Sequence, residues 1–470
     1  MSIWGLTGWQ WLAVFQHELL LFAVVFFLIG AIDDFAIDLS WLWLKLKGRA
    51  QTPHISREAL RRSELTGPAA IFIPAWQEAD VIGDTIRHAL ANWPQRGLRL
   101  YVGCYRNDPT TISAAIDAAS GDSRLRIVVH GHDGPTTKAD CLNRLYQALR
   151  GDEARLGIRF ACVVFHDAED MVDPAGLGLL DRTIADGADF AQLPVEPLVQ
   201  QGSRLLGSHY CEEFAEAHGK VMVVREALGA ALPAAGVGCA VSRDALERLC
   251  RQRGGHSPFA TESLTEDYEL GLTIAEGGGR CRFVRARGAE DGQLIATRAY
   301  FPSTLSEVTR QKTRWVHGIA LQGWDRVGWS GNAIETWMRA RDRRGPWTAL
   351  VLLTGYLLVI LTGLSWLAAS SGLTEPIVLT PLLKALLAAN LFAFLWRAVW
   401  RFAFTASVYG IGEGVLAVLR IPIANVIAII AGRRAVTAYA RTLLGRRVEW
   451  DKTRHAHHPA RQAPTEEQAA

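Results

Sequence analysis

Long apolar segments lie at both ends of the chain and limit the folds that it can adopt. Residues 19–37, 347–368 and 379–400 are each long enough and apolar enough to cross a bilayer as one helix. Backbone groups inside a bilayer must find their hydrogen bonds within the protein, so segments of this length are expected to be α-helices. The sequence therefore predicts a membrane anchor over residues 1–50 and a transmembrane hairpin over residues 345–402.

Charges beside the first apolar segment predict its orientation. No Lys or Arg precedes the segment and no small-residue cleavage site follows it, so we expect an uncleaved anchor and not a signal peptide. Lys45, Lys47 and Arg49 come shortly after it. Because positive residues are enriched on the cytoplasmic side of membrane segments, we expect the N-terminus outside and the following domain in the cytoplasm.

The apolar stretch after the hairpin, residues 402–431, differs from the three predicted spans. It is flanked by arginines on both sides and is interrupted by glycine, charge and proline, at Gly410, Gly412, Glu413, Arg420 and Pro422. Two cytoplasmic flanks exclude a single crossing, and the stretch is too short to cross twice. We therefore expect residues 403–451 to form an interfacial or re-entrant amphipathic segment. The polar tail over residues 452–470 is predicted to be disordered.

The charge balance argues against a nucleic-acid partner, and the cysteine pattern indicates a reducing compartment. The 50 basic and 47 acidic residues nearly cancel, so no nucleic-acid-binding surface is expected. All seven cysteines fall between the first and second apolar segments, and none forms a C-x-x-C pair. This pattern predicts free, buried thiols in a reducing compartment.

The middle of the chain, residues 51–335, is predicted to be one α/β domain with interfacial helices near residues 305–335. Between residues 66 and 330, apolar runs alternate with helical patterns; strands are expected at 69–74, 98–104, 125–130 and 160–166, and helices at 81–92, 110–119 and 138–150. Such alternation is typical of βαβ units and a mainly parallel sheet. Ligands bind beyond the carboxyl ends of the strands in these sheets.

An acidic motif follows the last of these strands. Asp167 and Glu169 are one residue apart, and Asp170 comes next. Carboxylates at this spacing can share one Mg²⁺ or Mn²⁺ ion, which commonly bridges to a diphosphate. A solvated acidic turn is the alternative interpretation.

A second acidic motif consists of Thr265, Glu266 and Asp267 at the expected start of a helix. A positioned carboxylate can remove the proton of an attacking hydroxyl. The same residues also suit a helix start, with Thr265 as the cap and two acids in the first turn.

A third motif places Gln311, Arg314 and Trp315 on one face of a helix, because their spacing is i, i+3, i+4. An arginine can donate paired hydrogen bonds to a diphosphate, and a tryptophan face can stack on a sugar ring. An amphipathic helix on the membrane surface is compatible with the same pattern.

In their order and spacing, these motifs resemble the inverting family-2 glycosyltransferases of the cellulose-synthase and hyaluronan-synthase type. The resemblance covers roughly residues 66–455 and implies a GT-A fold, a Rossmann-like arrangement with a mixed, mainly parallel sheet. It implies that Asp267 is the general base, with Glu266 and Thr265 beside it in the catalytic motif. It further implies a metal site at Asp167, Glu169 and Asp170.

Further segments carry the same resemblance. The turn of Pro74, Gln77 and Glu78 is similar to the family turn that opens the nucleotide site, and Lys138 matches a lysine that supports the diphosphate. Gln311 and Arg314 are implied to bind near the leaving diphosphate. Acceptor-binding roles are implied for Trp315, Gly238 and Cys239. Residues 450–455 are similar to a Trp-x-x-Thr gating element.

Three departures from the family pattern are visible. Glu169 stands where Asp is usual, and Gln77 stands where Asn is usual. The paired aspartates expected after the second strand are missing, which leaves Asp108 as the candidate for contacting the base or ribose.

The Gln77-Glu78 turn and the segment from Tyr105 to Pro109 are similar to bacterial inner-membrane glycosyltransferases of the phage adsorption protein B type. This resemblance implies transfer from a UDP-sugar, a hexose or N-acetylhexosamine, to a growing β-linked exopolysaccharide, with Mg²⁺ or Mn²⁺ as cofactor. The alternatives are a single addition to a lipid-linked acceptor and an inactive membrane scaffold or receptor. The resemblance also leaves room for an export or outer-membrane partner, a separate cyclic di-GMP-responsive subunit and a homo-oligomer.

Overall fold

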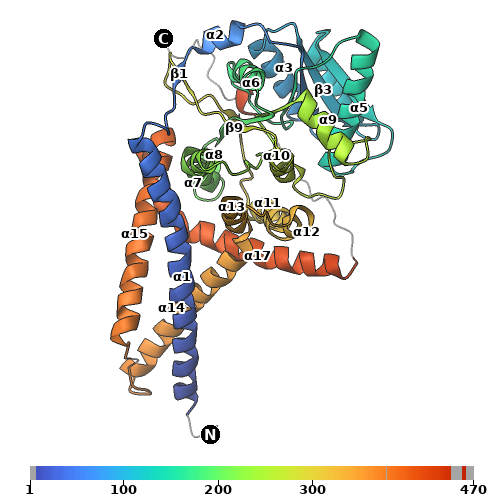
Figure 1. Cartoon of the computed structure of the whole chain (residues 1–470). Helices are drawn as coiled ribbons and strands as arrows, with labels where there is room; N and C mark the ends of the chain where they lie inside the picture. The colour runs from blue at the N-terminus through green and yellow to red at the C-terminus, as the bar shows by residue number, and fades with distance from the viewer. Residues whose placement is uncertain (1–6, 377, 446–457, 462–470) are drawn as a thin grey trace.

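A computed structural model describes residues 7–376, 378–445 and 458–461. An α/β domain lies on a base of long helices, with the N-terminal helix α1 running away from the domain (Figure 1). This arrangement confirms the predicted fold class. All seven cysteines are free, and all but Cys281 are buried, as their spacing predicted.

The α/β domain is built on a seven-stranded sheet whose strands follow the order β4-β3-β2-β5-β8-β6-β9. The four strands β4, β3, β2 and β5 are parallel to one another and β9 is parallel to β6, whereas β8 is antiparallel to both β5 and β6. The bounds, in sheet order, are Leu125–His130, Leu98–Tyr105, Ala69–Pro74, Cys162–Phe165, Cys239–Ser242, Phe190–Gln192 and Cys281–Phe283. The predicted mainly parallel sheet is therefore confirmed.

Helices cover both faces of the sheet because successive side chains of each strand point to opposite sides. On β2, Ile71 and Ile73 join one buried cluster and Phe72 joins the other. The first cluster is covered by α3 (Ile82–Asn92), α4 (Pro109–Ala119) and α6 (Gly176–Ala185), and the second by α5 (Lys138–Leu156), α9 (Arg243–Gln252) and α10 (Glu266–Glu276). The helix predicted to end at Arg150 continues to Leu156.

Smaller elements connect the sheet to the helical base. Two short pairs flank it, β1 (His54–Ile55) with β10 (Arg287–Gly288) and β7 (Val195–Pro197) with β11 (Thr297–Ala299). The remaining helices of the domain are α2 (Arg57–Arg62), α7 (His209–Glu216), α8 (Met222–Ala227), α11 (Leu305–Trp315), α12 (Gly323–Val327) and α13 (Ala333–Arg343). Two π-helical turns, Ala217–Val221 and Val316–Gln322, link α7 to α8 and α11 to α12.

Four helices of the described residues are long and apolar enough to cross a membrane: α1 (Gly8–Leu46), α14 (Gly345–Ser370), α15 (Pro381–Tyr409) and α17 (Ile421–Leu443). Helices α1 and α14 contain the first two predicted spans, and α15 contains the third except for its first two residues. Their length and composition indicate a membrane protein.

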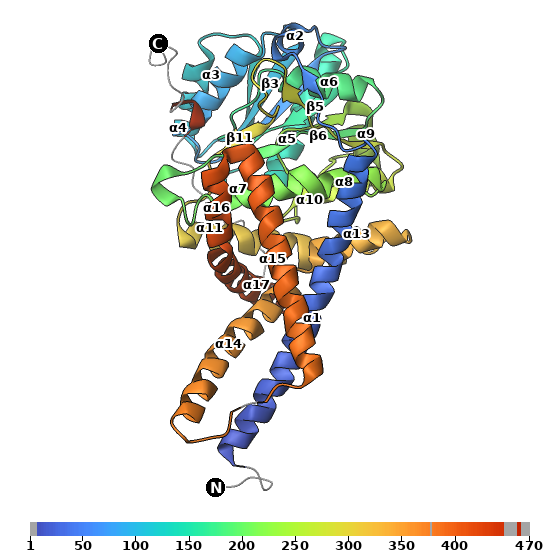
Figure 2. The ribbon, with the colours of Figure 1, turned by 90° about the vertical axis from the view of Figure 1, so that its left-hand side faces the viewer.

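Helix α17 differs from the other three in direction. It runs crosswise to α1 and α15 in Figure 1 and is seen almost end-on in Figure 2, after the quarter turn. It packs against α11 of the domain and against α14 of the base. Length and composition alone would admit it as a fourth span, so the interfacial placement of residues 403–451 stays a prediction.

The boundaries of this C-terminal region differ from those expected. Helix α15 continues to Tyr409, beyond the predicted hairpin limit at residue 402, and is followed by α16 (Ile411–Leu419). Residues 446–457 and 462–470 lie outside the described part of the chain, and with them the Trp-x-x-Thr segment. Within the tail predicted to be disordered, the described residues 458–461 include a short helical turn, Pro459–Arg461, which lies against α3.

Buried ion pairs join the domain to the helical base. Lys220 of the π-helical turn after α7 pairs with Asp38 of α1, and both side chains are buried. Glu212 of α7 is fully buried and lies 2.9 Å from Arg401 and 3.1 Å from Arg420. Since a buried charge without a partner costs several kcal/mol, each pair favours one docking geometry.

We expect Arg420→Met to lower the free energy of unfolding by about 3 kcal/mol, because it removes a buried positive charge from the carboxylates of Glu212 and Glu413 and leaves each with a single arginine partner. Arg420 is fully buried and also lies 2.9 Å from Glu413. Thermal unfolding in detergent measures the loss, with Arg433→Met, on the exposed side of α17, as the matched control. Equal melting temperatures for the two variants would contradict the proposed role of the ion pairs.

Candidate active site

A cavity of about 680 Å³ lies between the α/β domain and helices α11 and α17. Ten of the residues singled out in the sequence line it: Lys138, Asp167, Glu169, Asp170, Thr265, Glu266, Asp267, Gln311, Arg314 and Trp315. They come from the start of α5, the turn after β5, the start of α10 and the end of α11. The structure therefore brings the three motifs and the lysine to one place.

The strongest charge contact in the cavity joins Lys138 to Asp167. The ammonium Nζ lies 2.6 Å from Oδ1 of Asp167, and both side chains are mostly buried. Burial opposes the positive charge, but the carboxylates of Asp167, Glu266 and Asp267 outweigh it and raise the pKa of Lys138. Lys138 thus holds a fixed positive charge among the acids.

Within the first acidic motif, Asp170 has a structural role. Its buried carboxylate lies 2.9 Å from His166 Nδ1 and accepts a hydrogen bond of 3.0 Å from the backbone N–H of Asp167. These contacts fix the turn that presents Asp167 and Glu169 to the cavity. Asp167 and Glu169 are therefore the carboxylates best placed to hold a hard divalent cation there.

Asp267 and Glu266 begin helix α10, and Thr265 occupies its cap position without a side-chain cap bond. Asp267 lies against the backbone of Gly236, where a Cβ would come within 2.5 Å of its Oδ2. Gly236 also has a positive φ of 82°, so a side chain is excluded there on two grounds. Burial raises the pKa of Asp267, and burial together with the charge of Asp267 raises the pKa of Glu266.

The third motif lies on α11 as its spacing predicted. Gln311, Arg314 and Trp315 face the cavity, directly before the π-helical turn Val316–Gln322. Trp315 packs edge-on against Tyr210 and Phe214. Their rings hold the indole in place at the cavity wall.

The predicted nucleotide turn lies outside the residues that line this cavity. Gln77 has a positive φ of 53°, and its backbone N–H donates a 2.6 Å hydrogen bond to Asp108. Asp108 also caps α4 through the N–H of Thr111. Asp108 therefore fixes the position of the turn from Pro74 to Glu78.

Gly238 and Cys239, predicted beside the acceptor, also lie outside the lining. Cys239 is buried in β8, and Gly238 packs its backbone against Thr297. Their neighbours Ala235 and Val237 line the cavity instead.

Several lining residues were not singled out in the sequence. Phe214 and Phe301 add aromatic surface next to Trp315, and Thr442 reaches the cavity from α17. The loop of residues 261–264 completes the rim. These aromatic residues and the threonine belong to no sequence motif, so their place in the cavity could be learned only from the structure.

The C-terminal residues 458–461 dock behind the acidic turn. His458 is fully buried, with Nε2 3.2 Å from the carbonyl oxygen of Asp170. Arg461 donates to the carbonyl of Asp80 (2.8 Å) and pairs with Asp84 of α3. The far end of the chain thus supports the turn that carries Asp167.

Comparison with known proteins identifies relatives over the same region. The sequence model of the family described as "Glycosyltransferase like family 2" matches residues 67–318. Bacteriophage adsorption protein B of Escherichia coli strain K12 and bacteriophage N4 adsorption protein B of Escherichia coli O157:H7 are both 32% identical over 476 aligned positions. These alignments cover 95% of this chain, which spans only 62% of the length of either relative.

Among solved structures, the mannosyltransferase PcManGT of Pyrobaculum calidifontis, in complex with GDP-Man and Mn²⁺, is similar in fold. Its TM-score is 0.50 at 15% identity, with 87% of this chain and 99% of that chain covered. At this identity the likeness concerns the fold alone.

The Glu266 carboxyl generates a prediction about stability and pH. Its pKa is raised from 4.5 to about 7, so the folded protein keeps a proton that the unfolded chain has released between these pH values. The free energy of unfolding therefore falls as pH rises through this window. We expect Glu266→Gln to remove that fall, so the variant gains stability over the wild type at neutral pH and not at acidic pH.

Melting temperatures in detergent, taken from about pH 5 to about pH 8, measure the difference in stability between Glu266→Gln and the wild type. Glu262→Gln is the matched control, because Glu262 lies on the same rim with a side chain that is 76% exposed. A difference that does not change with pH would contradict the raised pKa.

Proposed function

The chain belongs to glycosyltransferase family 2, and from this premise we propose that it is an inverting transferase of the bacterial inner membrane. It moves a sugar from a UDP-sugar to a growing β-linked exopolysaccharide. The observation that carries the proposal is the convergence of Asp267, the Lys138–Asp167 pair and Arg314 on one cavity.

Asp267 serves as the general base. The acceptor hydroxyl attacks the anomeric carbon from the face opposite the diphosphate, and its proton passes to the Asp267 carboxylate. A bond from the acceptor oxygen to the anomeric carbon forms as the bond to the diphosphate oxygen breaks, which inverts the anomeric centre. Burial of Asp267, which raises its pKa, strengthens it as a base.

Positive side chains receive the leaving diphosphate. Arg314 offers paired N–H donors, and Lys138 adds a charge that the surrounding carboxylates keep in place. Asp167 and Glu169 would hold Mg²⁺ or Mn²⁺, which would supply further positive charge to the diphosphate. Gln311 lies one turn before Arg314 on the same helix face and belongs to the same subsite.

The aromatic wall suits the glycan acceptor. Trp315, Phe214 and Phe301 line the cavity beside each other, and aromatic faces bind the apolar faces of sugar rings. Gln77, Glu78 and Asp108 position the turn at the end of β2 and thereby support the nucleotide side of the site. Gly238 and Cys239 do not line the cavity. They support the acceptor subsite indirectly, because they belong to the same backbone segment as Ala235 and Val237, which do line it.

The catalytic domain is proposed to face the cytoplasm, where nucleotide sugars are made, consistent with Lys45, Lys47 and Arg49 after α1. Export of a polymer through so few spanning helices calls for a second copy of the chain or for a separate export partner.

A second candidate function is a single addition to a lipid-linked acceptor. Thr442 of α17 lines the cavity, and α17 is apolar enough for a membrane and packs on α14. An acceptor head group carried at the membrane surface could therefore reach the site from that side.

We expect nucleotide release from one donor in a panel of UDP-sugars, with GDP-mannose added as a donor carrying another nucleotide, and Asp267→Asn to lower its rate by about 10²–10⁴-fold. The full chain in detergent with Mn²⁺ or Mg²⁺ is used. Asp117→Asn, on the exposed side of α4, is the matched control. Unchanged release in Asp267→Asn, with normal folding, would contradict Asp267 as the base.

Product length separates the two candidate functions. A processive enzyme supplied with donor alone yields a ladder of long products, whereas a single addition requires a lipid-linked acceptor and stops after one sugar. Gel analysis of radiolabelled product distinguishes them.

A further inference from the structure

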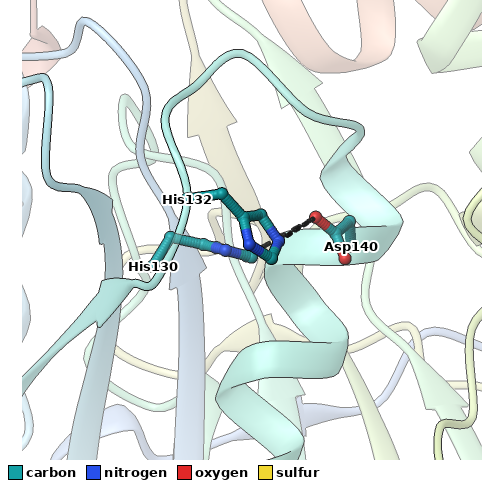
Figure 3. Close-up of side chains that lie close together, drawn as sticks. All are labelled: His130, His132 and Asp140. Carbon is teal, nitrogen blue, oxygen red and sulfur yellow. Dashed lines mark ion pairs between the residues drawn. The ribbon is translucent and has the colours of Figure 1, made fainter.

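Two histidines and an aspartate form a cluster outside the residues that line the cavity. His130 ends β4, His132 follows two residues later, and Asp140 lies in the first turn of α5. Figure 3 shows the three side chains pointing toward one another. One ligand atom from each lies within 4.8 Å of the other two.

His130 is the unusual member of this cluster. Its side chain is only 4% exposed, yet neither ring nitrogen has a hydrogen-bond partner among the described residues. Nearly all buried polar side-chain atoms in proteins have a partner, because an unpaired one costs about 1–3 kcal/mol. The ring is also held in orientation, since Tyr105 stacks parallel to it with centroids 4.9 Å apart.

The distances in the cluster exceed those of hydrogen bonds but approach those of ligands around one ion. His130 Nε2 and His132 Nε2 lie 3.6 and 4.0 Å from Oδ2 of Asp140. Tetrahedral ligands about 2.0–2.1 Å from zinc are about 3.4 Å apart. His132 is 69% exposed, so its ring has room to turn toward the other two side chains.

We propose that His130, His132 and Asp140 bind a divalent transition-metal ion of the zinc class. Two imidazoles and one carboxylate favour such an ion over Mg²⁺, which prefers oxygen ligands alone. Three protein ligands leave a fourth position for water.

The position of this site connects it to the cavity. The ligands bracket the loop from β4 to α5, and that loop delivers Thr137 and Lys138 to the cavity wall. A bound ion would tie the start of the loop, at His130 and His132, to Asp140 just beyond its end. Occupancy therefore stabilises the conformation in which Lys138 meets Asp167.

The test measures metal binding directly and does not depend on the proposed transferase activity. The full chain, carrying a tag without histidines, is stripped with a chelator and titrated with Zn²⁺ against a chromophoric competitor. Excess Mg²⁺ is present to occupy the carboxylates of Asp167 and Glu169. We expect one Zn²⁺ per chain, and an affinity lowered roughly 100-fold or more in His132→Ala and in Asp140→Asn.

His132→Ala is the decisive variant because an exposed side chain can be removed without loss of the fold. His256→Ala, at an exposed histidine of the loop after α9, is the matched control and should bind like the wild type. Co²⁺ supplies a spectroscopic readout, since its visible absorption reports nitrogen ligands and should be lost with His132. Zn²⁺ affinity unchanged in His132→Ala, or absence of stoichiometric binding by the wild type, would overturn the proposal.

Discussion

Charges buried between the α/β domain and the long helices hold the two parts in one arrangement. Lys220 with Asp38, and Glu212 with Arg401 and Arg420, lie where water cannot replace a lost partner. The cavity has walls from both parts, with Asp267 on one side and Thr442 of α17 on another. Its shape therefore depends on this docking.

Inside the cavity, carboxylates outnumber cations and repel one another. Lys138 offsets part of that repulsion by pairing with Asp167. A negatively charged ligand would compete with Asp167 for the same ammonium group, so its binding would redistribute charge around Asp167 and Asp267.

The parts of the fold that follow from local pattern could be predicted from the sequence. The strand at residues 69–74 is apolar throughout because it is buried on both faces, and the helix carrying Gln311 and Arg314 has a regular spacing. Both were placed correctly from the sequence. The end of α15 was not, because apolar sequence continues past Arg401 without a break before Gly410.

Contacts that depend on the folded geometry could not be predicted. Asp170 has the same side chain as Asp167, and only the proximity of His166 and the turn backbone makes it a structural acceptor. The antiparallel insertion of β8 between β5 and β6 joins strands of three or four residues, which are too short to show a period. The three members of the His130 cluster come together only once β4 and α5 are packed.

Residues 458–461 connect the turn that carries Asp167 to helix α3. His458 and Arg461 tie this segment to the Asp170 turn and to α3, so a pull on the C-terminus is transmitted to the turn that presents Asp167. A fluorophore attached within residues 458–461 therefore lies beside this turn, and energy transfer to a labelled nucleotide would report when the cavity fills.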